Sequence, residues 1–221
     1  MCFSATASFT AGSALLLVGA VTARGAERQA ELPFALVPLL FGIQQLIEGF
    51  LWLALPAGPS LLNNVLTHAY SFFSHVLWPV YIPVAVLLLE PVPWRRRVLT
   101  GVALAGAAVG VYLLYALVRL PIVVVVSERH IAYTSPHFYA YAVMTLYVLG
   151  TCVSPMVSSH AMVRLFGAAA LVSFVAAYLF YATWFISVWC FFAALLSVIV
   201  LLHFRGNPAA RTRRPESTNA A

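Results

Sequence analysis

The stretch that decides the fold runs from Phe41 to Leu53 and reads FGIQQLIEGFLWL. It lies inside a longer apolar segment, residues 32–54, which has about the length that a helix needs to cross a bilayer. Polar side chains in such a helix must face protein or water rather than lipid. Glu48 lies four residues after Gln44 and three after Gln45, so all three can share one face of a helix. The run therefore predicts a membrane helix with one polar stripe.

The composition of the whole chain points to the same class. Of its 221 residues, 63% are hydrophobic and 8% are charged, whereas soluble domains carry about 25% charged residues. So few charges could not cover the surface of a soluble fold, which excludes a soluble enzyme, a disordered protein and a nucleic-acid-binding protein. The net charge of +6 comes from arginine and glutamate alone, and without lysine no retinal Schiff base can form.

Seven segments have the length and apolarity of membrane spans, which predicts an all-α polytopic membrane protein with a bundle of seven transmembrane helices. The seven segments are 7–23, 32–54, 64–89, 98–118, 138–154, 163–181 and 184–204. Together they form one transmembrane domain, residues 1–205. Residues 206–221 have no apolar period and are expected to be a disordered cytoplasmic tail.

The arginines predict the orientation, because cytoplasmic loops carry an excess of positive charge. With the N-terminus outside and the C-terminus inside, Arg119 and Arg129 remain outside and all other arginines are cytoplasmic. The cytoplasmic set is Arg24, Arg28, Arg95, Arg96, Arg97, Arg164, Arg205, Arg211, Arg213 and Arg214. We therefore expect a multi-pass protein of the cell inner membrane, N-out and C-in.

The outer loop, residues 119–137, contains a β-branched run that ends at Val126 and a second short run from His130 to Tyr133. A polar turn separates the two runs, which predicts a small outer β-hairpin. An irregular loop and an extension of the fourth helix are the alternatives.

The third span carries a second polar stripe, with side chains at steps of four, three and four residues. The third span is antiparallel to the second. Along the membrane normal, Glu48 lies at a level between His68 and His75, so we expect a contact between Glu48 and one of these histidines. Pro79 and Pro83 should kink this helix just beyond His75. The predicted ligand-binding residues of the two stripes are Gln44, Gln45, Glu48, Asn64, His68, Ser71 and His75.

Three functions are compatible with these stripes. The first is binding or sensing of a small molecule, a lipid or a proton at an outward-facing polar pocket between the second and third helices. The second is an intramembrane oxidoreductase or hydrolase in which Glu48 and His75 are the catalytic acid and base. The third is a structural or assembly partner whose polar groups fix helix packing.

The enzyme alternative includes a metal, for which His68, His75 and Glu48 are candidate ligands. The two histidines are seven residues apart, about 10.5 Å along a helix, which is marginal for one ion. Cys2 is a further candidate, because removal of Met1 would leave an amine and a thiol on one residue. The sequence leaves open whether the protein is an enzyme, and which cofactor or ligand it takes.

Three stretches carry a resemblance to a known family. They are Met1-Cys2-Phe3-Ser4-Ala5, Gln44-Gln45-x-x-Glu48-Gly49 and Phe73-Ser74-His75-Val76-Leu77-Trp78-Pro79. In these stretches the chain resembles an uncharacterised family of bacterial multi-pass membrane proteins, DUF6629. The resemblance spans the N-terminus through the seventh helix and implies a bacterial inner-membrane protein. It implies no activity and no catalytic residues.

Overall fold

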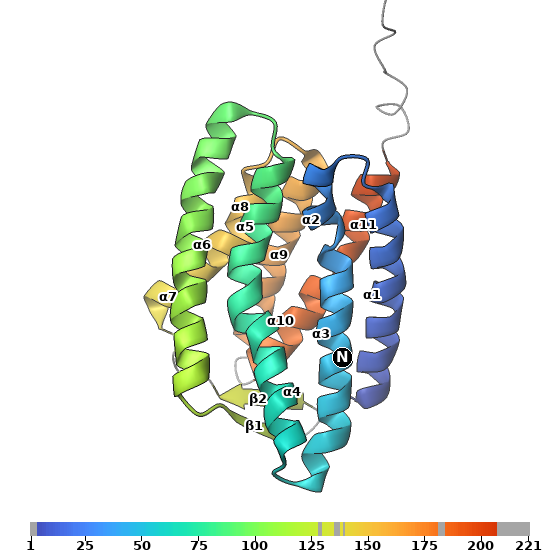
Figure 1. Ribbon diagram of the computed structural model, residues 1–221, viewed down its shortest axis with the longest axis vertical. Helices are drawn as coiled ribbons and strands as arrows, with labels where there is room; N and C mark the ends of the chain where they lie inside the picture. Colours follow the sequence, from blue (N-terminus) through green and yellow to red (C-terminus); the bar gives the residue numbers. More distant parts are fainter. Residues whose placement is uncertain (1–3, 128–129, 135–137, 139, 181–183, 207–221) are drawn as a thin grey trace, which may run out of the picture.

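The computed structural model describes residues 4–127, 130–134, 138, 140–180 and 184–206. These residues form a bundle of helices that run side by side, with a two-stranded hairpin at the lower end (Figure 1). The α-helices are α1 (Ala5–Gly25), α2 (Leu32–Ala35), α3 (Val37–Ala54), α4 (Leu61–Ser71), α5 (Trp78–Leu89), α6 (Pro93–Arg119), α7 (Tyr141–Val148), α8 (Ser154–Met156), α9 (Ala161–Phe180), α10 (Phe185–Leu195) and α11 (Ser197–Arg205). Two 3₁₀-helices, η1 (Gln29–Glu31) and η2 (Leu55–Ala57), and two π-helices, η3 (Phe72–Leu77) and η4 (Leu149–Val153), connect them.

Six helical segments of the described residues are long and apolar enough to cross a membrane, which indicates a membrane protein. They are Ala5–Gly25, Gln29–Ala57, Leu61–Leu89, Pro93–Arg119, Ala161–Phe180 and Phe185–Arg205. The fifth expected span, residues 138–154, is instead a shorter apolar helix, Tyr141–Met156. Figure 1 shows α7 beginning partway along the bundle, above the hairpin. The chain before it places Phe138 in the core, where its side chain is 1% exposed, so the helix starts late.

Both π-helices lie just before a proline. Pro79 follows η3 and Pro155 follows η4, and neither proline can donate the backbone hydrogen bond that the preceding turn of an α-helix requires. A π-helix takes up one extra residue in a turn and so changes which side chains face the bundle. In the third segment this change falls between α4 and α5, at the position of His75.

The strands β1 (Val123–Ser127) and β2 (His130–Thr134) pair in antiparallel register, with Val124 opposite Tyr133. The side chains of Ile131 and Tyr133 are buried, and the Tyr133 ring stacks on Tyr70 of α4 with centroids 4.6 Å apart. The hairpin therefore packs against the helices in the lower part of the bundle, where β2 contacts α10 and β1 contacts η2 (Figure 1).

At the upper end, one buried carboxylate joins two loops. The Glu90 side chain is 1% exposed, and it accepts hydrogen bonds from the Ser159 N–H at 2.6 Å, the Ser158 hydroxyl at 3.1 Å and the Val92 N–H at 3.1 Å. Burial raises the pKa of Glu90, but these donors together outweigh it and hold the pKa below its ordinary value.

Replacing Glu90 with glutamine should destabilise the protein by about 1–3 kcal/mol at neutral pH, because an amide cannot accept all of these bonds. A carboxyl with a lowered folded-state pKa stabilises the fold above its unfolded pKa of about 4.3, and loses that contribution as the pH falls through the folded value. The difference in melting temperature between wild type and Glu90→Gln should thus be largest near pH 7 and become smaller below about pH 4. The exposed Glu27 supplies the comparison: an interaction of an exposed carboxylate contributes about 0–1 kcal/mol, so Glu27→Gln should cost less than Glu90→Gln at pH 7.

Candidate functional site

The second and third segments, which pack against each other, bury several polar residues inside the bundle. We call these residues the Glu48 cluster: Gln44, Gln45, Glu48, Ser71, Ser74 and His75. On α3, Gln44, Gln45 and Glu48 are each at most 1% exposed. The Ser187 hydroxyl of α10 donates to Glu48 Oε1 at 2.6 Å, and Trp78 Nε1 of α5 donates to Gln44 Oε1 at 2.7 Å. These two bonds tie α3 to α10 and α5.

The opposite side of the cluster lies on η3 and the end of α4. His75 is 3% exposed, and its Nδ1 lies 2.8 Å from the Ser74 hydroxyl. The Ser74 carbonyl accepts a hydrogen bond from the Tyr147 hydroxyl of α7. The Phe138 ring packs against the imidazole with centroids 4.7 Å apart. His75 is thus enclosed by a polar neighbour, an aromatic ring and the backbone of its own helix.

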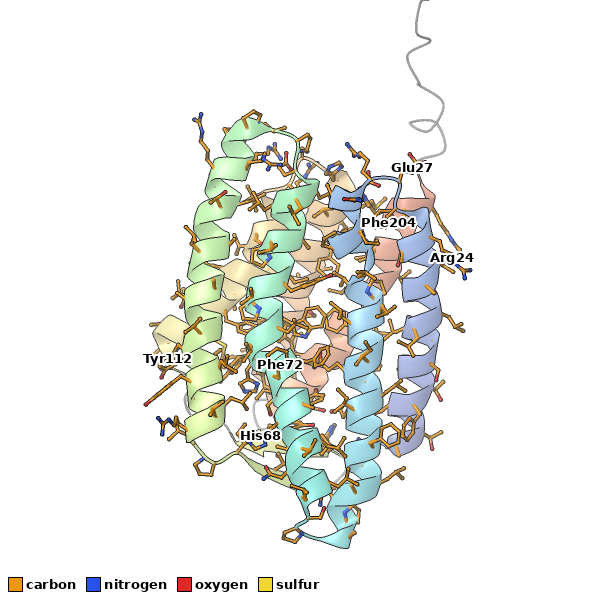
Figure 2. The ribbon with its side chains drawn as sticks, in the orientation of Figure 1. Arg24, Glu27, His68, Phe72, Tyr112 and Phe204 are labelled. Atoms are coloured by element: carbon orange, nitrogen blue, oxygen red, sulfur yellow. The ribbon has the colours of Figure 1, made fainter. Side chains whose placement is uncertain are left out.

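Five of the seven predicted ligand residues are buried in the bundle, and two are not. Ser71 and His75 are buried in the cluster with the three α3 residues, whereas Asn64 is exposed and His68 is half-buried. His68 Nδ1 lies 2.8 Å from the Asn64 carbonyl, and Figure 2 shows His68 in the lower part of the bundle. The stripe was expected on a regular helix, but η3 shifts its phase. The polar residues of α4 that face inward are Asn63, Thr67 and Ser71.

The expected Glu48–histidine contact is replaced by other pairings. Glu48 bonds to Ser187 and His75 bonds to Ser74, because α10 packs against α3 at this depth. Sequence reasoning missed Ser187 and also Cys190, whose thiol lies within hydrogen-bonding reach of Gln44 and Tyr70. The available signal was a serine and a cysteine three residues apart in the last span, since small polar side chains in membrane helices often face other helices.

Several buried polar atoms of the cluster have no hydrogen-bond partner within the described part of the protein. Among the described residues, no partner is found for both amide atoms of Gln45, the Ser71 hydroxyl and Nε2 of His75, whereas the Gln44 amide faces the Cys190 thiol. Buried polar atoms are paired in the great majority of cases, and each unpaired one costs about 1–3 kcal/mol. In this cluster the four unpaired atoms lie on α3, α4 and η3.

Two spaces flank the cluster. A cavity of about 20 Å³, room for one water-sized molecule, is lined by Phe41, Trp78, Ile82, Thr151, Phe166, Ala170, Trp189 and Cys190. A groove of about 470 Å³ opens at the lower end and is lined by Leu55, Gly58, Pro59, Ser60, Asn63, Asn64, Thr67, Ile122 and Val124. Thr67 lines this groove one turn of helix before Ser71, so the inward face of α4 leads from the groove to the cluster.

Of the candidate metal ligands, Glu48 and His75 lie in the cluster and His68 lies outside it. Among the described residues, no three His, Cys, Asp or Glu side chains are grouped so that they could hold a metal ion. Cys2 falls outside the described residues, as do residues 135–137 of the outer loop and 207–221 of the tail.

A comparison with protein families matches residues 1–215 to a family of unknown function (DUF6629). The chain belongs to this family. The match includes every helix of the bundle and all residues of the Glu48 cluster, and it confirms the resemblance drawn from the sequence. Comparisons with curated proteins and with solved structures gave no match. DUF6629 membership carries no activity, so the function has to be argued from the site.

Proposed function

We propose that this protein binds, and thereby senses, a small polar ligand or a proton at the Glu48 cluster. The observation that carries the proposal is the set of unpaired donors and acceptors on Gln45, Ser71 and His75, all of them buried inside the bundle. A ligand with both donor and acceptor groups, or a proton shared with bound water, would satisfy them.

The proposed topology is N-out and C-in, in a bacterial inner membrane, with the short segment Tyr141–Met156 counted as the fifth of seven crossings. It is supported by the arginines at the ends of the helices. Arg24 and Arg205 end α1 and α11 at the upper end of the bundle, and Arg95 and Arg164 lie in the first turns of α6 and α9, whereas Arg119 ends α6 at the lower end. This orientation makes the hairpin and the 470 Å³ groove face outward.

The route that we propose starts in the groove at Thr67, follows the inward face of α4 past Ser71, and ends at His75 and Glu48. An imidazole exchanges protons near neutral pH. The cluster holds neither lysine nor arginine to balance a carboxylate, since lysine is missing from the sequence and no arginine lies in α3 to α5. A change of proton or ligand occupancy would act directly on the Glu48–Ser187 bond, and so on the packing of α3 against α10.

Substitutions of two adjacent glutamines, Gln44 and Gln45, test the proposal. Gln45→Leu should raise the thermal stability of the ligand-free protein, because it removes two unpaired buried amide atoms without removing a bond inside the protein. Gln44→Leu is the matched control and should lower the stability by about 1 kcal/mol, because it removes the acceptor of Trp78 Nε1. For a protein of this size, 1 kcal/mol corresponds to about 2–4 °C in melting temperature.

The functional half of this test uses tryptophan fluorescence of the purified protein, because Trp78 and Trp189 line the cavity beside the cluster. Wild type should respond to acidification below about pH 5, because burial disfavours a charged imidazole, or to a member of a panel of small polar molecules. Gln45→Leu should lose the response. The proposal fails if Gln45→Leu destabilises the protein as much as Gln44→Leu does, since the Gln45 amide would then serve helix packing.

A further inference from the structure

We propose that the crevice between the ends of α1 and α11 binds the phosphodiester headgroup of an anionic lipid. The crevice has a volume of about 260 Å³ and is lined by Val21, Thr22, Arg24, Gly25, Leu201, Phe204 and Arg205. It lies at the upper end of the bundle, on the opposite side of the membrane from the groove, and is independent of the Glu48 cluster. Figure 2 shows Arg24 and Phe204 there, on adjacent helices.

The geometry brings two guanidinium groups to one opening. Helices α1 and α11 pack together and end at the same level, at Gly25 and Arg205. A Cβ atom at Gly25 would lie 3.4 Å from Phe204 Cβ, in ordinary van der Waals contact, so the two helix ends lie side by side. Arg24 and Arg205 are both exposed beside this contact.

Paired guanidinium groups, rather than net charge, would hold an anion at the opening. The two arginines contribute +2, the two helix C-termini about −1 together and Glu27 −1, so the net charge is about zero. In the described part of the chain, the one carboxylate–arginine ion pair joins Arg28 to Glu31 at 2.8 Å, which leaves Arg24 and Arg205 available to a ligand. The acidic Glu27 follows α1 at the same end, as Figure 2 shows, and is exposed to solvent.

The apolar side chains that line the crevice favour a lipid over a soluble phosphate as the ligand. Val21, Leu201 and Phe204 make the inner wall apolar. Below it, the two helices expose large apolar side chains, Leu17 at 71% and Val198 at 55%. An anionic lipid would place its phosphate between the guanidinium groups and an acyl chain along these faces, because basic residues at the interface attract anionic headgroups.

The test uses full-length protein in detergent, with bound lipid measured by native mass spectrometry and stability by thermal unfolding. Phosphatidylglycerol should bind and raise the melting temperature, whereas phosphatidylcholine and inorganic phosphate should not. The double variant Arg24→Gln/Arg205→Gln should bind phosphatidylglycerol about thirtyfold more weakly. The control Arg97→Gln/Arg119→Gln removes the same charge from exposed positions outside the crevice, and should bind like wild type.

A second variant tests whether lipid binding needs the space between the helices as well as the two charges. Val21→Trp keeps both arginines but fills the space between the helices, and it should also lose the bound lipid. The proposal is overturned if the double variant keeps wild-type affinity, if the control loses as much affinity as the double variant, or if Val21→Trp binds normally. An equal response to inorganic phosphate would overturn the assignment to a lipid.

Discussion

Replacing Gly106 with alanine should prevent the bundle from packing, with a loss of at least about 3 kcal/mol. A Cβ atom at this position of α6 would lie 2.0 Å from the carbonyl oxygen of Pro79, a backbone atom that no side-chain rotation can move. The carbonyl cannot retreat either, because Gly150 of η4 approaches it from another side, with its own Cβ position 2.9 Å away. Helix α5 is therefore held between α6 and η4 by two glycines.

The control for this prediction lies in the same helix. A Cβ at Gly101 would meet nothing within 4 Å, and alanine forms helices better than glycine by about 1 kcal/mol. Gly101→Ala should therefore be neutral or stabilising, whereas Gly106→Ala should reduce the yield of monodisperse protein and its melting temperature in detergent. Equal melting temperatures for the two variants would mean that α5 and α6 do not approach as closely as described.

The sequence was sufficient for the features that depend on length and local spacing. Six of the seven expected spans correspond to long apolar helices, because about 20 apolar residues have few other structures to adopt. Gln44, Gln45 and Glu48 are all buried on one side of α3, because their spacing places them there on any regular helix. The length of the helix in the fifth span was harder to predict. An apolar segment packed inside a bundle has the same composition as one that faces lipid, so composition does not show where the helix begins.

The parts of the site that escaped prediction depend on irregular backbone and on distant pairing. His75 and His68 appeared to share one face, but the π-helix before Pro79 turns His75 into the bundle and leaves His68 half-buried. Ser187 lies 139 residues from Glu48, and no local pattern connects them. Their contact follows from the way α10 packs against α3, which only the assembled bundle determines.

Glu48→Leu should cost more stability than Glu48→Gln, and the difference identifies what the carboxyl does. Glutamine keeps an oxygen that can accept the Ser187 hydroxyl at the position of Oε1, so Glu48→Gln should retain the fold with a small loss. Leucine removes that acceptor from a site that is 0% exposed, which should cost about 1–3 kcal/mol. Thermal unfolding of the purified variants in detergent measures both effects.

A double-mutant cycle with Ser187→Ala assigns the loss to the bond itself. If the Glu48–Ser187 bond carries the effect, Glu48→Leu should be milder in the Ser187→Ala background, with a coupling of about 0.5–3 kcal/mol. Additive losses would place the stabilising role of Glu48 elsewhere in the cluster. If Glu48→Leu leaves the melting temperature unchanged in both backgrounds, the carboxyl is not part of a buried network, and a water-filled vestibule at this depth becomes the better description. That outcome would also count against the proposed binding site, because water in such a vestibule would satisfy the amide, hydroxyl and imidazole groups of Gln45, Ser71 and His75.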